Sequence, residues 1–274
     1  MINRRNKITA GRVFLVTGGA SGLGRQLALQ AAERGASVVI WDRDAAGGKR
    51  VRDEIRATGR TAESFEIDIT DRAAVDKVAA KSGAVDVVIN NAGLVTGEWF
   101  LDAPAAKIER LFQVNVLALY WVTRAVLGGM VARNRGCVVT IASAAGLVGV
   151  AKQTDYSASK FAAVGFMESL RAELRAQDSS VNTLTVCPFY INTGMFDGVQ
   201  TKFPALLPIL DEVVVAGQIL DSIERGRAML VLPWFARTLP LVRLLPIRAF
   251  DRVADFFGIN KTMEYFRGRT SPTP

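Results

Sequence analysis

The sequence predicts an α/β protein with a doubly wound Rossmann fold, in which helices cover both faces of a seven-stranded parallel sheet. Short apolar runs alternate with amphipathic stretches along most of the chain, as strands alternate with helices in this fold. The runs are apolar throughout rather than at every second position, which is typical of parallel strands buried on both faces. A glycine-rich turn follows the first run, where dinucleotide-binding folds place their phosphate loop.

The expected elements follow from the order of these runs along the chain. Right-handed crossovers through the intervening helices bring the strands into one doubly wound sheet. We expect strands at residues 13–17, 37–42, 62–68, 85–90, 137–143, 181–187 and 228–232. We expect helices at residues 23–34, 45–57, 71–82, 104–133, 155–176 and 211–224.

We interpret residues 1–274 as a single dinucleotide-binding and catalytic domain, since neither a repeat nor a low-complexity linker divides the chain. Residues 1–11 form an N-terminal arm in this interpretation, and residues 194–225 form a lid region over the substrate. The alternation of strands and helices stops at residue 233, where a tail rich in Pro, Leu, Arg and Phe begins. We therefore expect residues 233–274 to form an apolar C-terminal extension.

Composition argues against several classes of protein. The net charge of +8 comes mostly from scattered arginines without a dense basic block, so we expect no nucleic-acid partner. The same surplus suits an anionic cofactor or an anionic membrane surface. The chain has no histidine and no CxxC motif, which argues against a metal site. Cys137 and Cys187 lie inside apolar runs, which indicates buried reduced thiols and a cytoplasmic protein.

The turn after the first expected strand reads TGGASGLG, residues 17–24. Gly18, Gly22 and Gly24 would let the backbone turn tightly and approach a pyrophosphate, whose charge would meet the N-terminus of the following helix. Glycine-rich turns between a strand and a helix also occur without ligands. The loop alone therefore leaves both interpretations open.

Asp42 ends the second expected strand, 18 residues after Gly24. In this fold an acidic residue at that position hydrogen-bonds the adenosine ribose and repels a 2′-phosphate. Ser21, before the second glycine of the motif, stands where an arginine could otherwise bind such a phosphate. These residues favour NAD over NADP, although Arg43 could turn toward a phosphate.

The stretch YSASK, residues 156–160, places Tyr156 and Lys160 one turn apart on the same face of an expected helix. A phenol keeps its proton until about pH 10, but a nearby ammonium favours the phenolate and lowers this pKa. The pair therefore suits proton transfer near neutral pH in a chain without histidine. The alternative is an aromatic residue on a helix surface beside a solvated lysine.

The motifs together resemble those of the short-chain dehydrogenase/reductase family. TGGASGLG, the NNAG stretch at residues 90–93 and YSASK occur in that family's order and at its spacings, with Asp68, Asn115 and Ser143 between them. The resemblance implies NAD(P)-dependent hydride transfer between an alcohol and a carbonyl compound. It covers residues 13 to about 195, which is most of the chain.

The same resemblance implies roles for four residues. Tyr156 would be the general acid/base, and Lys160 would lower its pKa and bind the nicotinamide ribose. Ser143 would donate a hydrogen bond to the substrate oxygen, and Asn115 would hold a water that relays the proton to solvent. The alternative is a relative that senses dinucleotide without catalysis, but such relatives typically lack the tyrosine or the lysine.

The resemblance also implies where the cofactor binds. Asp68 and Ile69 would flank the adenine, and residues 188–193 would cover the nicotinamide. The family usually has glycine after the proline that is Pro188 in this chain, whereas this chain has Phe189. We therefore expect residue 189 to have a backbone conformation that glycine adopts more easily than a bulky residue does. The expected cofactor-binding residues are Gly18, Ser21, Gly22, Leu23, Gly24, Asp42, Asp68, Ile69, Asn91, Gly93, Tyr156, Lys160, Pro188, Ile191 and Thr193.

A narrower resemblance concerns the branch that contains the retinol dehydrogenases and related 17-beta-hydroxysteroid dehydrogenases. VVIWDRD, CPFYINTGMF and the tail from LPIRAF onward carry it. It implies a bulky lipophilic alcohol or carbonyl compound as substrate. Many members have an N-terminal membrane anchor, which we do not expect here because the first strand begins by residue 13 and no signal-peptide core precedes it.

Three loops should shape the substrate pocket beyond the strand ends, at residues 94–103, 144–155 and 194–209. Apolar residues dominate these loops, so an apolar substrate could bind without charge contacts. A small alcohol or ketone remains the alternative, with these residues packed on each other or on a second subunit. The expected pocket residues are Leu94, Trp99, Leu147, Val148, Met195, Phe196, Phe203 and Leu206.

The C-terminal extension permits two interpretations. It is apolar with arginines at 237, 243, 248 and 252, which would suit peripheral contact with a membrane surface. Prolines at 233, 240 and 246 break any long helix, which favours a pocket wall or a subunit contact. By resemblance we also expect a homodimer or homotetramer that pairs through the helices at 104–133 and 155–176.

Overall fold

The computed structural model of the chain describes residues 9–268. Its centre is one seven-stranded parallel sheet, as the sequence predicts, and the strand order is β3-β2-β1-β4-β5-β6-β7. The strands are β1 (Val13–Thr17), β2 (Ser37–Asp42), β3 (Ala62–Glu66), β4 (Val87–Asn90), β5 (Cys137–Ile141), β6 (Asn182–Pro188) and β7 (Met229–Leu232).

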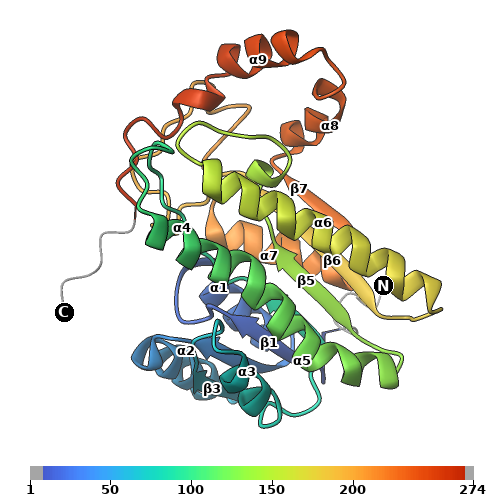
Figure 1. Ribbon diagram of the computed structural model, residues 1–274. Coiled ribbons are helices and arrows are strands. Elements are labelled where there is room, and N and C mark those ends of the chain that lie inside the picture. Colours follow the sequence, from blue (N-terminus) through green and yellow to red (C-terminus); the bar gives the residue numbers. More distant parts are fainter. Residues whose placement is uncertain (1–8, 269–274) are drawn as a thin grey trace.

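Two helix layers sandwich this sheet (Figure 1). Side chains that alternate along β1 enter different apolar clusters, with Phe14 and Val16 on one face and Leu15 on the other. The layer on the Phe14 face holds α1 (Gly22–Glu33), α2 (Ala45–Ala57) and α7 (Glu212–Glu224). The layer on the Leu15 face holds α3 (Arg72–Ala79), α5 (Ala118–Ala132) and α6 (Thr154–Ala176). Burial on both faces explains why the strands are apolar at every position.

The strand order reverses between β1 and β4, because the chain first builds outward through β2 and β3 and then returns to the other side of β1. In open parallel sheets, ligands bind beyond the carboxyl ends of the strands at such a reversal. The glycine-rich turn and the NNAG stretch both lie there, since they follow β1 and close β4. The topology thus brings these two motifs together.

Two predicted strands end earlier than expected. β3 ends at Glu66 and β5 at Ile141, so Asp68 and Ser143 lie in the loops just beyond the strands. The helix predicted at 104–133 is α4 (Ala105–Phe112) and α5, joined by a π-helical turn η2 (Gln113–Leu117). A π-helical turn inside a longer helix is rare and is frequently found at functional sites. Asn115 lies in its middle.

By length and composition alone, the stretch Ala105–Ala132 could cross a membrane, the one helical candidate among residues 9–268. The core helix of a soluble protein passes the same test, and this stretch contributes Val122, Val126 and Met130 to the apolar cluster beneath it. The candidate is therefore a weak argument for a membrane span.

The C-terminal extension continues from β7 through short helical turns. They are η4 (Trp234–Thr238), α8 (Leu239–Val242), α9 (Ile247–Phe256) and η5 (Ile259–Lys261), and α8 and α9 lie together beyond the helix layers (Figure 1). Pro233 and Pro246 directly precede η4 and α9, so the prolines divide the tail as predicted. Most of the predicted N-terminal arm, residues 1–8, and the last part of the extension, residues 269–274, lie outside the described residues.

Candidate active site

One cavity of about 310 Å³ lies beyond the carboxyl ends of the strands, between the glycine-rich turn and the C-terminal extension. Its volume falls at the lower end of the range for small-molecule sites. Asp42, Arg43, Asp68 and Arg110 line the end near the glycine turn, whereas the end near the extension is mostly apolar. This division of the lining suits a ligand that is charged at one end and apolar at the other.

The glycine-rich turn has a tight backbone conformation that requires glycine. Gly18 and Gly22 have φ angles of +66° and +52°, which side chains rarely adopt. A Cβ atom on Gly24 would lie 2.1 Å from the carbonyl oxygen of Gly18. Asn91 holds the turn from the next strand, because its Nδ2 donates to the carbonyl oxygens of Thr17 and Gly18 at 3.0 and 3.2 Å. The N-terminus of α1 therefore opens toward the cavity and fits a pyrophosphate.

Backbone amides fix the carboxylate of Asp42 at the end of β2. Oδ2 accepts from the N–H of Ala20 at 2.9 Å, and Oδ1 accepts from the N–H of Asp44 at 3.0 Å. The carboxylate still lines the cavity, and the neighbouring Arg43 lines it too. Both the acid that favours NAD and the arginine that could favour NADP therefore reach this end of the cavity.

Asp68 is held by an ion pair across the cavity mouth. Arg110 of α4 donates to its Oδ2 at 2.7 Å, and the hydroxyl of Thr70 donates to its Oδ1 at 2.7 Å. Partial burial works to raise the pKa of Asp68, but the hydrogen bonds from Thr70 and Arg110 outweigh it and lower the pKa. Asp68 is therefore a fixed carboxylate at neutral pH.

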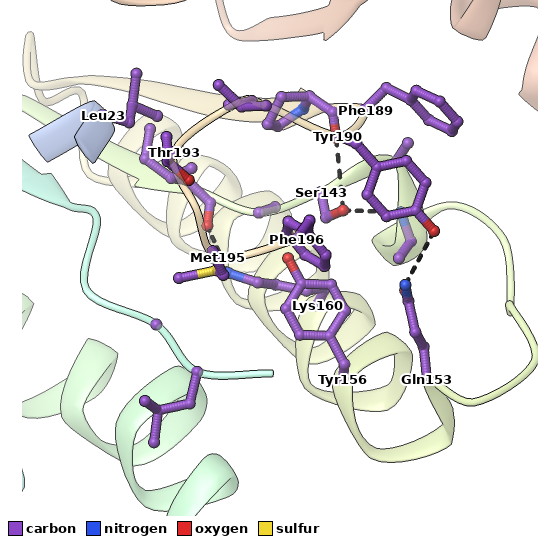
Figure 2. A pocket seen from close by; sticks show the side chains of 18 of the residues that line it. Leu23, Ser143, Gln153, Tyr156, Lys160, Phe189, Tyr190, Thr193, Met195 and Phe196 are labelled. Carbon is purple, nitrogen blue, oxygen red and sulfur yellow. Dashed lines mark hydrogen bonds between the residues drawn. The ribbon is translucent and has the colours of Figure 1, made fainter. Parts of the chain in front are cut away.

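Tyr156, Lys160 and Ser143 converge on the middle of the cavity (Figure 2). α6 carries the first two one turn apart, and Ser143 follows β5 and donates a hydrogen bond toward the Tyr156 hydroxyl. Nζ of Lys160 lies 5.5 Å from the centre of the Tyr156 ring and donates to the carbonyl oxygen of Ile141 at 2.8 Å. The spacing YSASK therefore places an ammonium beside a phenol, as predicted.

The pKa values of this pair do not follow the sequence prediction. Burial raises the pKa of Tyr156 above its ordinary value, and the hydrogen bond from Ser143 only partly opposes this. Burial also lowers the pKa of Lys160 to about 8. Burial thus outweighs the hydrogen bond from Ser143 and raises the pKa of Tyr156, whereas the sequence predicts that Lys160 lowers it.

Asn115 lies behind the cavity rather than on its wall. Its side-chain amide bonds the backbone of Leu94 twice, with Nδ2 donating to O at 2.9 Å and Oδ1 accepting from N at 2.8 Å. A second, small cavity of about 10 Å³ touches both Asn115 and Lys160, which is close to the minimum space for one water.

The main cavity gathers every predicted cofactor-binding residue and half of the predicted pocket residues. Trp99 is instead 56% exposed with Lys152 over its ring, and Phe203 packs on Phe256 and Phe257 of the extension. Pocket residues on the lining are Leu94, Val148, Met195 and Phe196, whereas Trp99, Leu147, Phe203 and Leu206 are not on it.

The sequence did not reveal much of the remaining wall. Gln153 and Tyr190 lie in stretches that the motifs indicated, but nothing singled out these two side chains. In α9 and the residue after it, the lining residues Phe250, Val253, Ala254 and Phe257 recur every three to four positions, which is a helical apolar pattern that could have indicated the inward face. The lining residues of the extension are Phe235, Ala236, Thr238, Leu239, Val242, Phe250, Val253, Ala254, Phe257 and Ile259.

Phe189 differs from the expectation of an unusual backbone. Within residues 9–268, the non-glycine residues with left-handed φ angles are Asn134, Lys152 and Asp178. The N–H of Phe189 bonds the carbonyl of Leu232 on β7 at 2.8 Å, so the backbone here continues the extended path of β6. Phenylalanine is accommodated without strain.

A Rossmann sheet with this glycine turn, with a serine just after β5 and with a tyrosine and a lysine one turn apart on α6, is the arrangement of a nicotinamide-dependent oxidoreductase. Residues 12–203 match the family described as short chain dehydrogenase. The chain belongs to this short-chain dehydrogenase/reductase family and is an NAD(P)-dependent dehydrogenase acting on CH–OH groups.

Known proteins resemble the chain over nearly its whole length. It is 41% identical to epidermal retinol dehydrogenase 2 of Mus musculus, covering 100% of this chain and 91% of that protein. It is 35% identical to human 17-beta-hydroxysteroid dehydrogenase 13, covering 90% and 84%. The crystal structure of a Burkholderia phymatum short-chain dehydrogenase/reductase in complex with NAD superposes with a TM-score of 0.78 at 24% identity, covering 97% and 99%. The two relatives confirm the predicted retinol and hydroxysteroid dehydrogenase branch, and the likeness to the solved structure shows the fold.

Proposed function

We propose that the protein transfers hydride between a nicotinamide and a lipophilic alcohol or carbonyl compound of the retinoid, steroid or fatty-alcohol class, with Tyr156 as general acid/base. One observation carries the proposal. The Tyr156 hydroxyl, beside Ser143 and Lys160, faces a cavity whose wall toward the C-terminal extension is mostly apolar. This proton carrier therefore lies where an apolar alcohol would present its oxygen.

The dinucleotide, when bound, accepts or supplies the hydride. The turn of Gly18, Gly22 and Gly24 would hold its pyrophosphate, and Asp42 its adenosine ribose. Asp68 and Ile69 would flank the adenine, and residues 188–193 would cover the nicotinamide. The close approach that Gly24 permits, together with the fixed carboxylate of Asp42, supports this assignment.

The remaining steps belong to the side chains of this protein. Ser143 donates a hydrogen bond to the substrate oxygen, and Tyr156 removes the hydroxyl proton during oxidation or returns it during reduction. Lys160, whose pKa of about 8 leaves it mostly protonated at pH 7, favours the phenolate. The small cavity beside Asn115 and Lys160 supports a single water that passes the proton onward.

The lining favours a lipophilic substrate over a small one. Among the described residues that line the cavity, the charged side chains are those near the glycine turn and Lys160, and the extension contributes none. Each buried CH2 group contributes about 0.8 kcal/mol to binding. A long or polycyclic alcohol could therefore bind tightly through apolar contacts alone.

The substrate class is tested with retinoid, steroid, fatty and short alcohols, each assayed with NAD and with NADP. We expect kcat/KM to rise by about tenfold or more from short alcohols to lipophilic ones, and to be higher with NAD because of Asp42. Equal kcat/KM values would contradict the lipophilic assignment. Dinucleotide binding without turnover of any alcohol would instead indicate a sensing protein.

We also propose that the protein is cytoplasmic and touches membranes peripherally through the outer face of the extension. Trp234, Leu241, Leu244, Ile247 and Phe256 are each at least 61% exposed, and four arginines outnumber the two aspartates of residues 233–256. Co-sedimentation with phosphatidylserine vesicles tests this, and serine substitution at Leu244 and Ile247 should release the protein. Wild-type protein that stays in the supernatant would contradict the proposal.

A homodimer or homotetramer through α5 and α6 is a further proposal. Several large apolar side chains on and beside these helices are exposed, and a second subunit could cover them. They are Leu117, Tyr120, Val131 and Phe161. Size-exclusion chromatography with light scattering tests it. A monomer at micromolar concentration would contradict it.

A further inference from the structure

A chain of side-chain hydrogen bonds joins the catalytic helix to the C-terminal extension. Nε2 of Gln153 donates to the Tyr190 hydroxyl at 3.0 Å, and this hydroxyl lies 2.8 Å from Oγ1 of Thr262. The Thr262 hydroxyl donates its one hydrogen to the carbonyl of Ile259 at 2.9 Å. Tyr190 therefore donates to Thr262 and accepts from Gln153, so every bond in the chain runs the same way.

This chain crosses three separate segments. Gln153 caps α6 three residues before Tyr156, Tyr190 follows β6, and Thr262 follows η5 in the extension. The three side chains are 1%, 6% and 3% exposed. Moving the extension away would leave buried polar groups unpaired, which is costly. The hydrogen bonds therefore hold the extension to the N-terminus of α6.

Aromatic contacts follow the same route. Phe196 makes edge contacts with Tyr156 and Tyr190, with ring centres at 5.7 and 5.0 Å, and its ring lies 6.4 Å from that of Phe266 in the extension. A Cβ atom on Gly97, which has a left-handed φ, would lie 2.0 Å from the Phe266 ring. The end of the extension is therefore closely seated beside the ring of Tyr156.

The hydrogen bonds of Gln153, Tyr190 and Thr262 form an anchor for the extension, and the anchored extension also faces the cavity. Val253, Phe257 and Ile259 lie just before Thr262 in the chain and line the apolar end of the cavity, and Gln153 and Tyr190 line it as well. The hydrogen-bonded chain thus fixes the wall that a bulky substrate would touch.

We propose that Tyr190 is a positioning residue that, together with Gln153 and Thr262, holds the C-terminal extension against α6 and so forms the wall for a bulky substrate. The anchoring itself stands on the structure, and its effect on substrate rests on the proposed function. Loss of the anchor weakens binding of lipophilic alcohols more than that of short ones, because only the former reach the extension.

Tyr190→Phe tests the anchor, since it keeps the ring and removes the oxygen at the centre of the chain. Hydrogen-exchange mass spectrometry of the purified full chain should show about tenfold faster exchange in residues 255–268, with the β1 and β4 peptides unchanged. Tyr265→Phe is the matched control, because it removes the same atom from a tyrosine in the extension that is 58% exposed. Unchanged exchange in Tyr190→Phe would overturn the anchoring.

Steady-state kinetics with a long-chain and a short alcohol tests the effect on substrate. In Tyr190→Phe we expect the KM for the long-chain alcohol to rise about tenfold relative to the KM for the short alcohol, while kcat stays the same. In Tyr265→Phe we expect no change in this ratio. An unchanged ratio, with the wild type active on the long-chain alcohol, would overturn this role. If the wild type turns over no lipophilic alcohol, the proposed function fails while hydrogen exchange still decides the anchor.

Thr262→Val, alone and combined with Tyr190→Phe, shows whether the chain acts as a unit. Both substitutions break the same link, so the double variant should exchange no faster than the faster single variant. Additive effects would show two independent structural contacts and would contradict the proposal.

Discussion

Lys160 carries a buried ammonium whose cost should be visible in stability. The side chain is 5% exposed, and none of the ion pairs among residues 9–268 involves it. Its hydrogen bond to the carbonyl of Ile141 is an incomplete replacement for water. Burial therefore lowers its pKa from 10.5 to about 8.

The sign of the pH effect follows from proton binding. The folded protein loses the Lys160 proton near pH 8 and the unfolded chain near pH 10.5. Between these values the unfolded chain binds more protons, so the Lys160 contribution to the free energy of unfolding rises with pH. The shift corresponds to about 3 kcal/mol between pH 7.5 and 10.5. Burial raises the pKa of Cys137, Cys187 and Tyr156. Above about pH 9 these three groups therefore lower the free energy of unfolding as the pH rises, opposite to Lys160.

A comparison of variants isolates the lysine. Lys160→Met keeps an unbranched side chain and removes the charge, while the cysteines and the tyrosine stay in both proteins. Urea unfolding at pH 7.5, 9 and 10.5 should show that the stability of Lys160→Met relative to wild type falls by about 3 kcal/mol across the range. Lys49→Met, at an exposed position of α2, should show no such trend. A difference that does not vary with pH would refute the buried-charge reasoning.

Three further predictions concern the cofactor and the substrate oxygen. Gly24→Ala should weaken dinucleotide binding at least about tenfold in a fluorescence titration, because its Cβ would lie 2.1 Å from the carbonyl oxygen of Gly18; an unchanged Kd would contradict the phosphate turn. Asp42→Ala should lower the ratio of kcat/KM with NAD to that with NADP about tenfold or more, and a constant ratio would show that Asp42 does not select the cofactor. Ser143→Ala should lower kcat about 10²-fold, and a wild-type kcat would remove Ser143 from the reaction.

Local signals predicted the parts of the fold and site that depend on neighbours in sequence. The apolar runs identified the strands, and the carboxyl ends of parallel strands necessarily meet, so the glycine turn and Asn91 came together as expected. The i, i+4 spacing likewise placed Lys160 beside Tyr156 on α6. These features need only strand order and helix geometry.

Features that depend on tertiary packing were not predictable. The raised pKa of Tyr156 comes from burial, which the motif cannot report. Trp99 lies in the expected loop but is exposed. The loop sequence does not show which of its apolar side chains turns inward, so this exposure could not be predicted. A side-chain hydrogen bond joins Tyr190 to Thr262, which are 72 residues apart, and no local pattern indicates such a contact.

The most direct test of the proposed chemistry is the rate of hydride transfer by Tyr156→Phe, measured in single-turnover absorbance experiments at saturating dinucleotide. We expect a rate lower by about 10²- to 10⁴-fold, with dinucleotide affinity close to wild type, because the ring stays and only the proton is lost. Tyr265→Phe should react like the wild type. Hydride transfer by Tyr156→Phe at the wild-type rate would show that Tyr156 is not the general acid/base.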